Sequence, residues 1–266
     1  MPAALELLTG FATAPDTTAT AVTMAAGNSS TIRAFDTSKM ARLLDAWADV
    51  QGAGYVRFRS PKLHDAVQGI RLATTVSDVS PLLPSKGPQR LYTQDTITWE
   101  MTGSATAADI ETSSMLVFYE DLPGIAARFI GVDELIRRAV NIFTVSNTLA
   151  LGTAGGYSGE EALNAEFDLG KNNVDYALLG YIVTVECASV RWRGADTGNL
   201  GIGGPGNETL RHVTREWFVR LTERFGIPLI PVFNYANKAG ILLDGAQDEN
   251  GADTTVTSIF AELAPR

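Results

Sequence analysis

Few residues in this chain could carry out nucleophilic or metal chemistry, and they lie far apart. The 266 residues include one cysteine, Cys187, and two histidines, His64 and His212. A thiolate nucleophile needs a nearby cation, such as a protonated histidine, to hold it ionised, and neither histidine is close to Cys187 in the sequence. A single cysteine provides neither an internal disulfide nor a zinc-binding pattern. We therefore expect Cys187, within the apolar run 181–192, to be a small buried side chain.

Carboxylates could support acid–base catalysis or bind a cation. Asp109 with Glu111, and Glu120 with Asp121, form pairs, but such pairs are expected by chance in a chain with 30 acidic residues. Adjacent or alternate positions do not establish the carboxyl separation that a glycosidase needs. The segment 244–253 carries several carboxylates, which are ligands for Ca²⁺. Its spacing differs from that of a helix–loop–helix calcium site, so a bound cation and a solvated hairpin tip both stay open.

A glycine-rich segment, 198–206, leads into an expected helix and superficially resembles a phosphate cradle. It lacks the Lys-Ser/Thr pair of a P-loop and the spacing of a dinucleotide fingerprint, and Pro205 removes one backbone donor. The tetrapeptide 156–159 is not the Gly-x-Ser-x-Gly elbow of a hydrolase. We interpret 198–206 as a surface insertion. The sequence thus indicates no catalytic residue, no cofactor-binding residue and no metal ligand, and we expect the protein not to be an enzyme.

Composition describes a globular, acidic protein. Hydrophobic residues make up 45% and charged residues 19%, which is typical of folded domains, and the net charge is −9. An acidic chain repels phosphate backbones, so we expect no direct binding to nucleic acid. The local basic group of Arg57, Arg59, Lys62 and Arg71 is interpreted as solvated charge on a strand face. No signal peptide and no transmembrane segment of about 20 apolar residues is expected.

β-strand patterns dominate the chain. In 96–101 the apolar side chains Ile97, Trp99 and Met101 alternate with polar ones. We expect ten to twelve short strands. Helices are expected at 37–50, 132–140 and 210–225, with a further one at 3–8. Long loops are expected at 76–88, 152–159 and 194–207, where they would contact other subunits.

The order of these elements predicts an internal duplication. The helix 37–50 precedes a strand at 55–58 and the sequence Gly-Ile-Arg-Leu at 69–72; the helix 210–225 precedes a strand at 229–233 and Gly-Ile-Leu-Leu at 240–243. The runs 114–120 and 258–263 close the two halves. Trp47 and Trp217 occupy matching helical positions and are expected to be buried anchors. We predict a mainly β fold of two tandem β-sandwich, jelly-roll-like modules with inserted helices, at 1–130 and 131–266.

This arrangement resembles the small double jelly-roll major capsid protein of icosahedral viruses. The paired segments 55–72 and 229–243 and the flanking strands carry the resemblance, which covers most of the chain and includes no diagnostic motif. In that family two β-sandwiches stand side by side and three chains form a pseudo-hexagonal tile. The expected helix at 37–50 comes earlier in its module than that family usually places one.

The resemblance implies a structural, self-assembling viral (phage) major capsid or coat protein that forms a shell lattice. It implies a homotrimer or higher lattice, other virion proteins as partners, no cofactor, and a place in the virion after assembly in the host cytoplasm. A carbohydrate- or surface-binding β-sandwich attachment protein remains the alternative; it would expose aromatic side chains, for which Tyr92, Tyr157 and Tyr235 are the candidates. An enzyme is a third class, and it would need polar side chains that converge in a pocket.

Overall fold

The computed structural model describes residues 3–63, 66–74, 80–81, 88–152, 154–163, 174–247 and 253–265. Strands hold 51% of the residues and helices 14%, and the strands form four antiparallel sheets. The predicted mainly β fold class is therefore confirmed.

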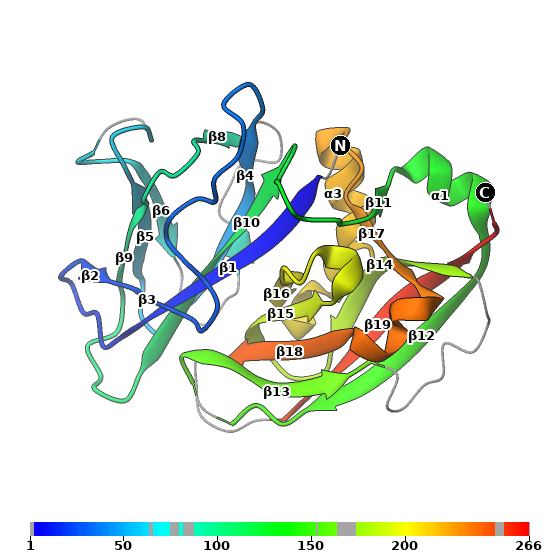
Figure 1. The fold of residues 1–266 in the computed structure, drawn as a ribbon. Helices are drawn as coiled ribbons and strands as arrows, with labels where there is room; N and C mark the ends of the chain where they lie inside the picture. Colours follow the sequence, from blue (N-terminus) through cyan, green and yellow to red (C-terminus); the bar gives the residue numbers. More distant parts are fainter. Residues whose placement is uncertain are drawn as a thin grey trace.

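The strands follow one another along the chain with few helical interruptions (Figure 1). They are β1 (Ala4–Thr13), β2 (Thr20–Ala21), β3 (Thr23–Met24), β4 (Ala41–Asp49), β5 (Gly54–Arg59), β6 (Ile70–Thr74), β7 (Ser80–Pro81), β8 (Gln89–Leu91), β9 (Thr98–Thr102), β10 (Ile110–Tyr119), β11 (Phe129–Ile130), β12 (Ala139–Leu149), β13 (Gly156–Ala162), β14 (Asp175–Val183), β15 (Cys187–Arg193), β16 (Ile202–Gly206), β17 (Ile230–Asn234), β18 (Leu242–Gln247) and β19 (Thr254–Leu263). The helices are α1 (Val132–Arg138), α2 (Arg211–Thr214) and α3 (Trp217–Phe225), with short 3-10 helices η1 (Ala195–Thr197), η2 (Glu208–Leu210) and η3 (Tyr235–Gly240).

The two halves of the chain wind into sandwiches of the same strand order. One sheet of the first sandwich has the order β3-β1-β10-β4-β7, with β8 also paired to β4, and the other has the order β2-β9-β5-β6. The second sandwich has β11-β17-β14-β19-β12 and β13-β18-β15-β16. For a comparison, β3 and β11 are left out and β7 and β8 are counted as one strand. The eight remaining strands of each sandwich are then numbered 1 to 8 in chain order. With this numbering the two sheets of both sandwiches have the strand orders 1-8-3-6 and 2-7-4-5. Eight antiparallel strands wound in this way into two facing sheets make a jelly roll.

The internal repeat is present, but the predicted correspondence of its segments is largely wrong. In the common strand order β5 corresponds to β15 and not to β17, so the segment 55–58 matches 187–193 rather than 229–233. The runs 114–120 and 258–263 do correspond, as β10 and β19. The matching tryptophans are also not equivalent, because Trp47 lies on a strand and Trp217 on a helix.

The expected helix at 37–50 is the strand β4, and the expected helix at 3–8 is part of β1. Strand β4 is buried on both faces, and a register shift opposite Leu116 and Val117 leaves Leu44 as an extra residue. The bulge interrupts the alternation of period two. Apolar side chains at 43, 44 and 47, with Met40 just before the strand, then imitate the spacing of a helix.

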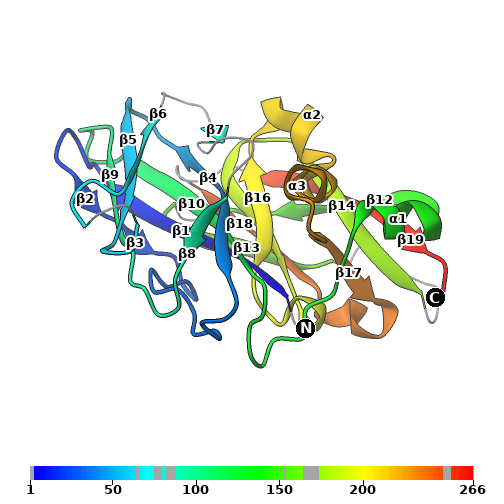
Figure 2. The same cartoon turned by 90° about the horizontal axis from the view of Figure 1, so that it is seen from above.

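The helices of the second sandwich agree better with the sequence pattern. Helix α1 occupies most of the predicted 132–140. The expected helix 210–225 is divided into η2, α2 and α3; the Asn207 side chain caps its start and Gly226 ends it with φ 67°. Helix α3 packs on β14 and β17, and Figure 2 shows it beside β16, where it covers an edge of the second sandwich.

The four sheets form four layers, and the sheet that contains β1, β10 and β4 is an inner one (Figure 1). Along β1, Ala4 and Leu8 face the core of the first sandwich, whereas Leu5 and Leu7 face the core that includes the second sandwich. Strand β10 alternates likewise, since Val117 belongs to the first core and Leu116 to the second. One sheet thus serves two hydrophobic cores. Strand β11, which precedes the predicted boundary at 130, pairs with β17; the division into 1–130 and 131–266 stays a prediction.

We predict that Trp47 and Trp217 stabilise the protein jointly. Their rings meet edge to face with centroids 6.0 Å apart, and their indole nitrogens donate to the carbonyl oxygens of Ala188 and Gly203. Trp47→Phe and Trp217→Phe should each lower the free energy of unfolding by about 1–3 kcal/mol, because a buried carbonyl loses its donor. In a double-mutant cycle by chemical denaturation, the two changes should couple by about 0.5–1.5 kcal/mol.

Trp99 provides the matched control for this cycle. Its indole nitrogen also donates to a buried oxygen, that of Ser113, but its ring lies in the core of the first sandwich. Trp99→Phe combined with Trp47→Phe should be additive within about 0.5 kcal/mol. Additivity of the Trp47–Trp217 pair would show that the two layers do not depend on this contact.

Candidate functional site

The glycine-rich segment forms the buried strand β16 at the junction of the sandwiches, so its interpretation as a surface insertion was wrong. Strand β16 pairs with β15, and all five of its residues are buried. The backbone of Leu7 in β1 donates to Gly201 O at 2.7 Å. A Cβ on Gly203 would overlap Val190 O and approach Leu7, and one on Gly204 would overlap the Tyr181 hydroxyl. The glycines are present because two layers approach each other here without intervening side chains.

A chain of hydroxyl groups crosses the same junction. The Tyr157 hydroxyl lies 2.7 Å from Thr9 Oγ1 and 3.3 Å from Ser189 Oγ, and Thr9 Oγ1 lies 2.9 Å from Ser114 Oγ. These residues come from β13, β1, β15 and β10, so the chain joins both sandwiches. Burial raises the pKa of Tyr157, which keeps the phenol protonated as a neutral hydrogen-bonding group. The predicted loop 152–159 therefore includes part of a junction strand, although residue 153 lies outside the described residues.

A buried ion pair lies next to this hydroxyl chain. Arg191 Nε and Nη2 donate to the two carboxylate oxygens of Asp244 at 2.7 and 2.9 Å, and the Arg191 guanidinium lies 3.4 Å from the centroid of the Tyr157 ring. Burial acts to lower the pKa of Arg191, but the hydrogen bonds to Asp244 and the electrostatic interactions with Tyr157 and Asp244 together outweigh it and the pKa is raised. Arg193 adds contacts to Asp244 and Glu160. A bidentate, stacked arginine holds β13, β15 and β18 in one register.

This ion pair removes the first acidic residue from the candidate cation loop. Both carboxylate oxygens of Asp244 are engaged by Arg191. Residues 248–252 lie outside the described residues. Within the described part of the chain, no group of three or more His, Cys, Asp or Glu side chains could hold a metal ion.

Of the four basic residues that the sequence placed on a strand face, Arg57, Arg59 and Arg71 lie on β5 and β6, whereas Lys62 lies in the turn after β5. Arg57 and Arg59 both donate to Glu100, at 2.8 and 2.7 Å, and the Arg71 guanidinium lies 3.8 Å from the centroid of the Tyr55 ring. Burial acts to raise the pKa of Glu100, but the hydrogen bonds and charges of the two arginines outweigh it and the pKa is lowered. The cluster is a network of partly exposed ion pairs.

The candidate carboxylate pairs do not form an acid–base dyad. Asp109 accepts a hydrogen bond from the Ser104 hydroxyl, and Glu111 accepts one from the Ser104 backbone N–H, so the serine binds both. Glu120 accepts from the backbone N–H of Met40 at 3.2 Å. Glu111 is fully buried, and its Oε2 has no hydrogen-bond partner among the described residues.

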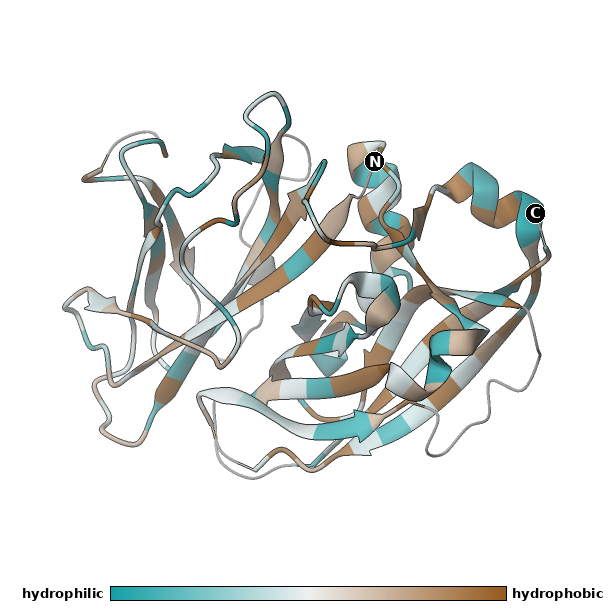
Figure 3. Cartoon of the chain, in the orientation of Figure 1, coloured by the Kyte–Doolittle hydropathy of each residue, from teal (hydrophilic) through white to brown (hydrophobic). Residues whose placement is uncertain are grey.

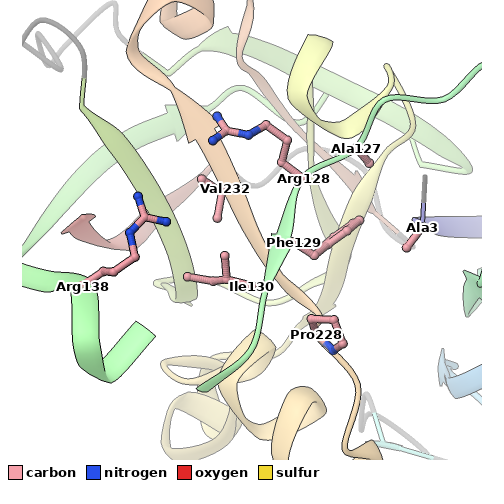
Figure 4. Close-up of a pocket in the computed structure, with 8 residues that line it drawn as sticks. All are labelled: Ala3, Ala127, Arg128, Phe129, Ile130, Arg138, Pro228 and Val232. Atoms are coloured by element: carbon pink, nitrogen blue, oxygen red, sulfur yellow. The ribbon is translucent and has the colours of Figure 1, made fainter. Parts of the chain in front are cut away.

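Two surface pockets contain arginines that are already paired. The first, of about 320 Å³, is lined by Ala3, Ala127, Arg128, Phe129, Ile130, Arg138, Pro228 and Val232. Figure 4 shows the arginines on different sides of Val232. Arg128 binds Asp175 at 2.6 Å, and Arg138 binds Glu134 at 2.7 Å. In the second pocket, of about 420 Å³, Arg33 binds Glu6. Neither pocket presents an uncompensated positive charge to a ligand.

The remaining candidate residues are dispersed. Cys187 is buried, as predicted, and His212 is exposed on α2; His64 lies outside the described residues. Tyr157 is engaged at the junction, Tyr92 is 36% exposed on the first sandwich, and Tyr235 is half-buried on the second. These tyrosines do not form one binding platform. Among the described helices, none is long and apolar enough to cross a membrane.

Three large apolar side chains close together in the sequence are exposed where α1 passes into β12. Ile136 on α1 and Val140 and Ile142 on β12 are 72%, 59% and 69% exposed. In Figure 3 hydrophilic and hydrophobic residues alternate along α1, and the C-terminal end of β13 is hydrophilic. We define Ile136, Val140 and Ile142 as the β12 patch.

Comparisons with known proteins give weak structural neighbours and no family. No family model matches the chain, and no curated protein matches it. The PBSX exported protein XepA is 9% identical, with 96% of this chain and 86% of that chain covered and a TM-score of 0.29. A chain of the Sulfolobus Turreted Icosahedral Virus is 10% identical, with 98% of this chain and 53% of that chain covered and a TM-score of 0.23. These weak neighbours thus include an icosahedral virus protein, and the strand order given above is independent of them.

We predict that a methyl group on β16 disturbs the packing of this strand against β14 and α3 in the second sandwich. Gly204→Ala should lower the free energy of unfolding by about 1–3 kcal/mol, because its Cβ would overlap the Tyr181 hydroxyl and the Trp217 indole. Gly156→Ala on β13 is the matched control, since nothing lies within 4 Å of its added Cβ. Equal melting temperatures for the two variants would contradict close packing of β16 against β14 and α3.

We also predict opposite pH dependences for the buried carboxyl group of Glu111 and the partly buried one of Asp175. Burial raises the pKa of Glu111, so its contribution to stability is complete below the unfolded pKa and is lost as pH rises through the folded pKa. For Asp175, burial acts to raise the pKa, but hydrogen bonds from Arg128 and Asn234 outweigh it and the pKa is lowered. The Asp175 contribution is therefore present above the unfolded pKa and is lost as pH falls through the folded pKa.

Urea unfolding of wild type, Glu111→Gln and Asp175→Asn between about pH 3 and pH 7.5 measures both effects. The wild-type advantage over Glu111→Gln should decrease as pH rises. The advantage over Asp175→Asn should decrease as pH falls. If the free energy of unfolding changed with pH in the same way for all three proteins, neither the raised pKa of Glu111 nor the lowered pKa of Asp175 would hold.

Proposed function

We propose that the protein is a self-assembling structural subunit, a viral (phage) major capsid or coat protein that forms a shell lattice. It would act as a homotrimer or a higher lattice, together with other virion proteins. Its place would be in the virion after assembly in the host cytoplasm. It would need no cofactor and carry out no catalysis.

The observation that carries this proposal is the inner sheet with two apolar faces. Two jelly rolls that share a close-packed junction form a rigid block, and such a block presents the broad side surfaces that extended assemblies need. Jelly rolls also occur in lectin domains and cupins, so the fold alone does not select a function. The polar groups of the junction are engaged with one another, which suits a role in holding the block together rather than in binding a substrate.

The surface features are consistent with assembly. A net charge of −9 disfavours direct contact with a genome. The candidate tyrosines are dispersed, which gives less support to the alternative of a carbohydrate-binding attachment protein. The β12 patch exposes three large apolar side chains close together in the sequence.

We predict that the purified chain assembles as its concentration rises. Light scattering over a wide range of concentration and salt should show a trimer or larger species, and electron microscopy should show shells, tubes or sheets. A monomer under all conditions would overturn the proposal. A reproducible hydrolytic or transfer activity that is lost on changing one carboxylate would indicate an enzyme instead.

A further inference from the structure

Among the sheet edges of the described residues, strand β12 combines the greatest length with the absence of charge and proline. The edge strands β2, β3 and β11 are two residues long. The other edges carry charges or proline: Arg71 in β6, Pro81 in β7, Arg90 in β8, Glu160 and Glu161 in β13, and Pro205 in β16. Short length, charge and proline are the usual means by which proteins block edge pairing. Strand β12 has eleven residues, none of them charged and none of them proline. A bulge at Val140 shifts its register with β19, and from Asn141 to Leu149 the pairing is regular.

The first half of β12 is also the part whose side chains are exposed to solvent. The side chains of Val140, Ile142 and Thr144 are exposed. Towards the other end, Asn147 Nδ2 reaches Ala162 O of β13 at 3.5 Å, and Val145 and Leu149 are buried. No described strand lies beyond β12 in its sheet. The exposed backbone edge and the β12 patch therefore coincide.

We propose that β12 pairs antiparallel with β12 of a second copy of this chain, around a twofold axis, with Val140 opposite Ile142 of the copy. In this register each apolar side chain of the pair faces another apolar side chain across the strands. Because the strand is uncharged, pairing it with itself brings no like charges together, which is the reason to assign a second copy as the partner. The sheet β11-β17-β14-β19-β12 then continues into its copy, as in strand addition at other sheet edges.

This inference deepens the proposed function and rests on it. A threefold contact within a tile and a twofold contact between tiles are different symmetry operations. A trimer alone is closed, whereas a trimer with a twofold edge can extend into a lattice. The β12 edge would thus be the contact between tiles rather than the contact within a tile.

Charge substitutions on the full-length chain test the pairing. Ile142→Lys and Val140→Glu place a charge in an apolar pair, so each variant alone should weaken the contact between tiles at least about tenfold in sedimentation velocity. An equimolar mixture should restore the large species, because the introduced ammonium group of one variant then faces the introduced carboxylate of the other. Val67→Lys, at a side chain 75% exposed on the first sandwich, is the matched control and should assemble like wild type.

The outcomes separate this inference from the proposed function. If wild type assembles and both single variants assemble equally well, the β12 contact is wrong and the structural role stands. If the mixture fails to recover, the stated register is wrong. If wild type is always a monomer, both proposals fail.

A second measurement needs no variant. Hydrogen exchange of wild type should show greater protection of the backbone amides in 140–144 at assembling concentrations than at dilute ones. Unchanged exchange there would overturn the pairing. Because both substituted side chains are exposed, the melting temperatures of the variants should stay within a few degrees of wild type.

Discussion

Burial of the strands β1, β10 and β4 on both faces of their sheet is the constraint on which the rest of the structure depends. These strands supply alternate side chains to two cores, so a change on either face is felt in a different sandwich. Close approach then requires glycine on the facing strand β16, and large aromatic groups fill the space beside it. Interiors of this density tolerate little change in volume.

Polar groups at the junction add direction to this apolar contact. Hydrophobic burial is not directional, whereas the Tyr157–Thr9–Ser114 chain and the Arg191–Asp244 pair require defined partners. Asp45 on β4 binds Arg224 on α3 at 2.7 Å, with the carboxylate side chain only 1% exposed. Loss of one member of such a buried pair leaves the other uncompensated, so these contacts oppose a sliding of the layers.

The sequence was informative where one face of an element meets water. Strand β9 was predicted because Ile97, Trp99 and Met101 alternate with exposed residues, and α1 and the end at Gly226 were predicted from helical patterns. Strands β4 and β16 were missed because both lie at the junction, where burial on two faces removes alternation. The Tyr157–Arg191–Asp244 cluster was missed because three separate strands assemble it. A lone arginine inside the apolar run 181–192 was a signal that a buried acidic partner exists.

The long sequence separation of β1 and β10 has a consequence for how the chain folds during synthesis. Leu5 pairs with Phe118 and Trp47 with Ser114, so the inner sheet cannot close until β10, which ends at Tyr119, has left the ribosome. Its second face stays uncovered until β16 and α3 are made, well into the second half of the chain. Non-local pairing of this kind is slow, and exposed apolar strands aggregate in the meantime. That face is therefore the part of the nascent chain most open to aggregation until the second sandwich covers it.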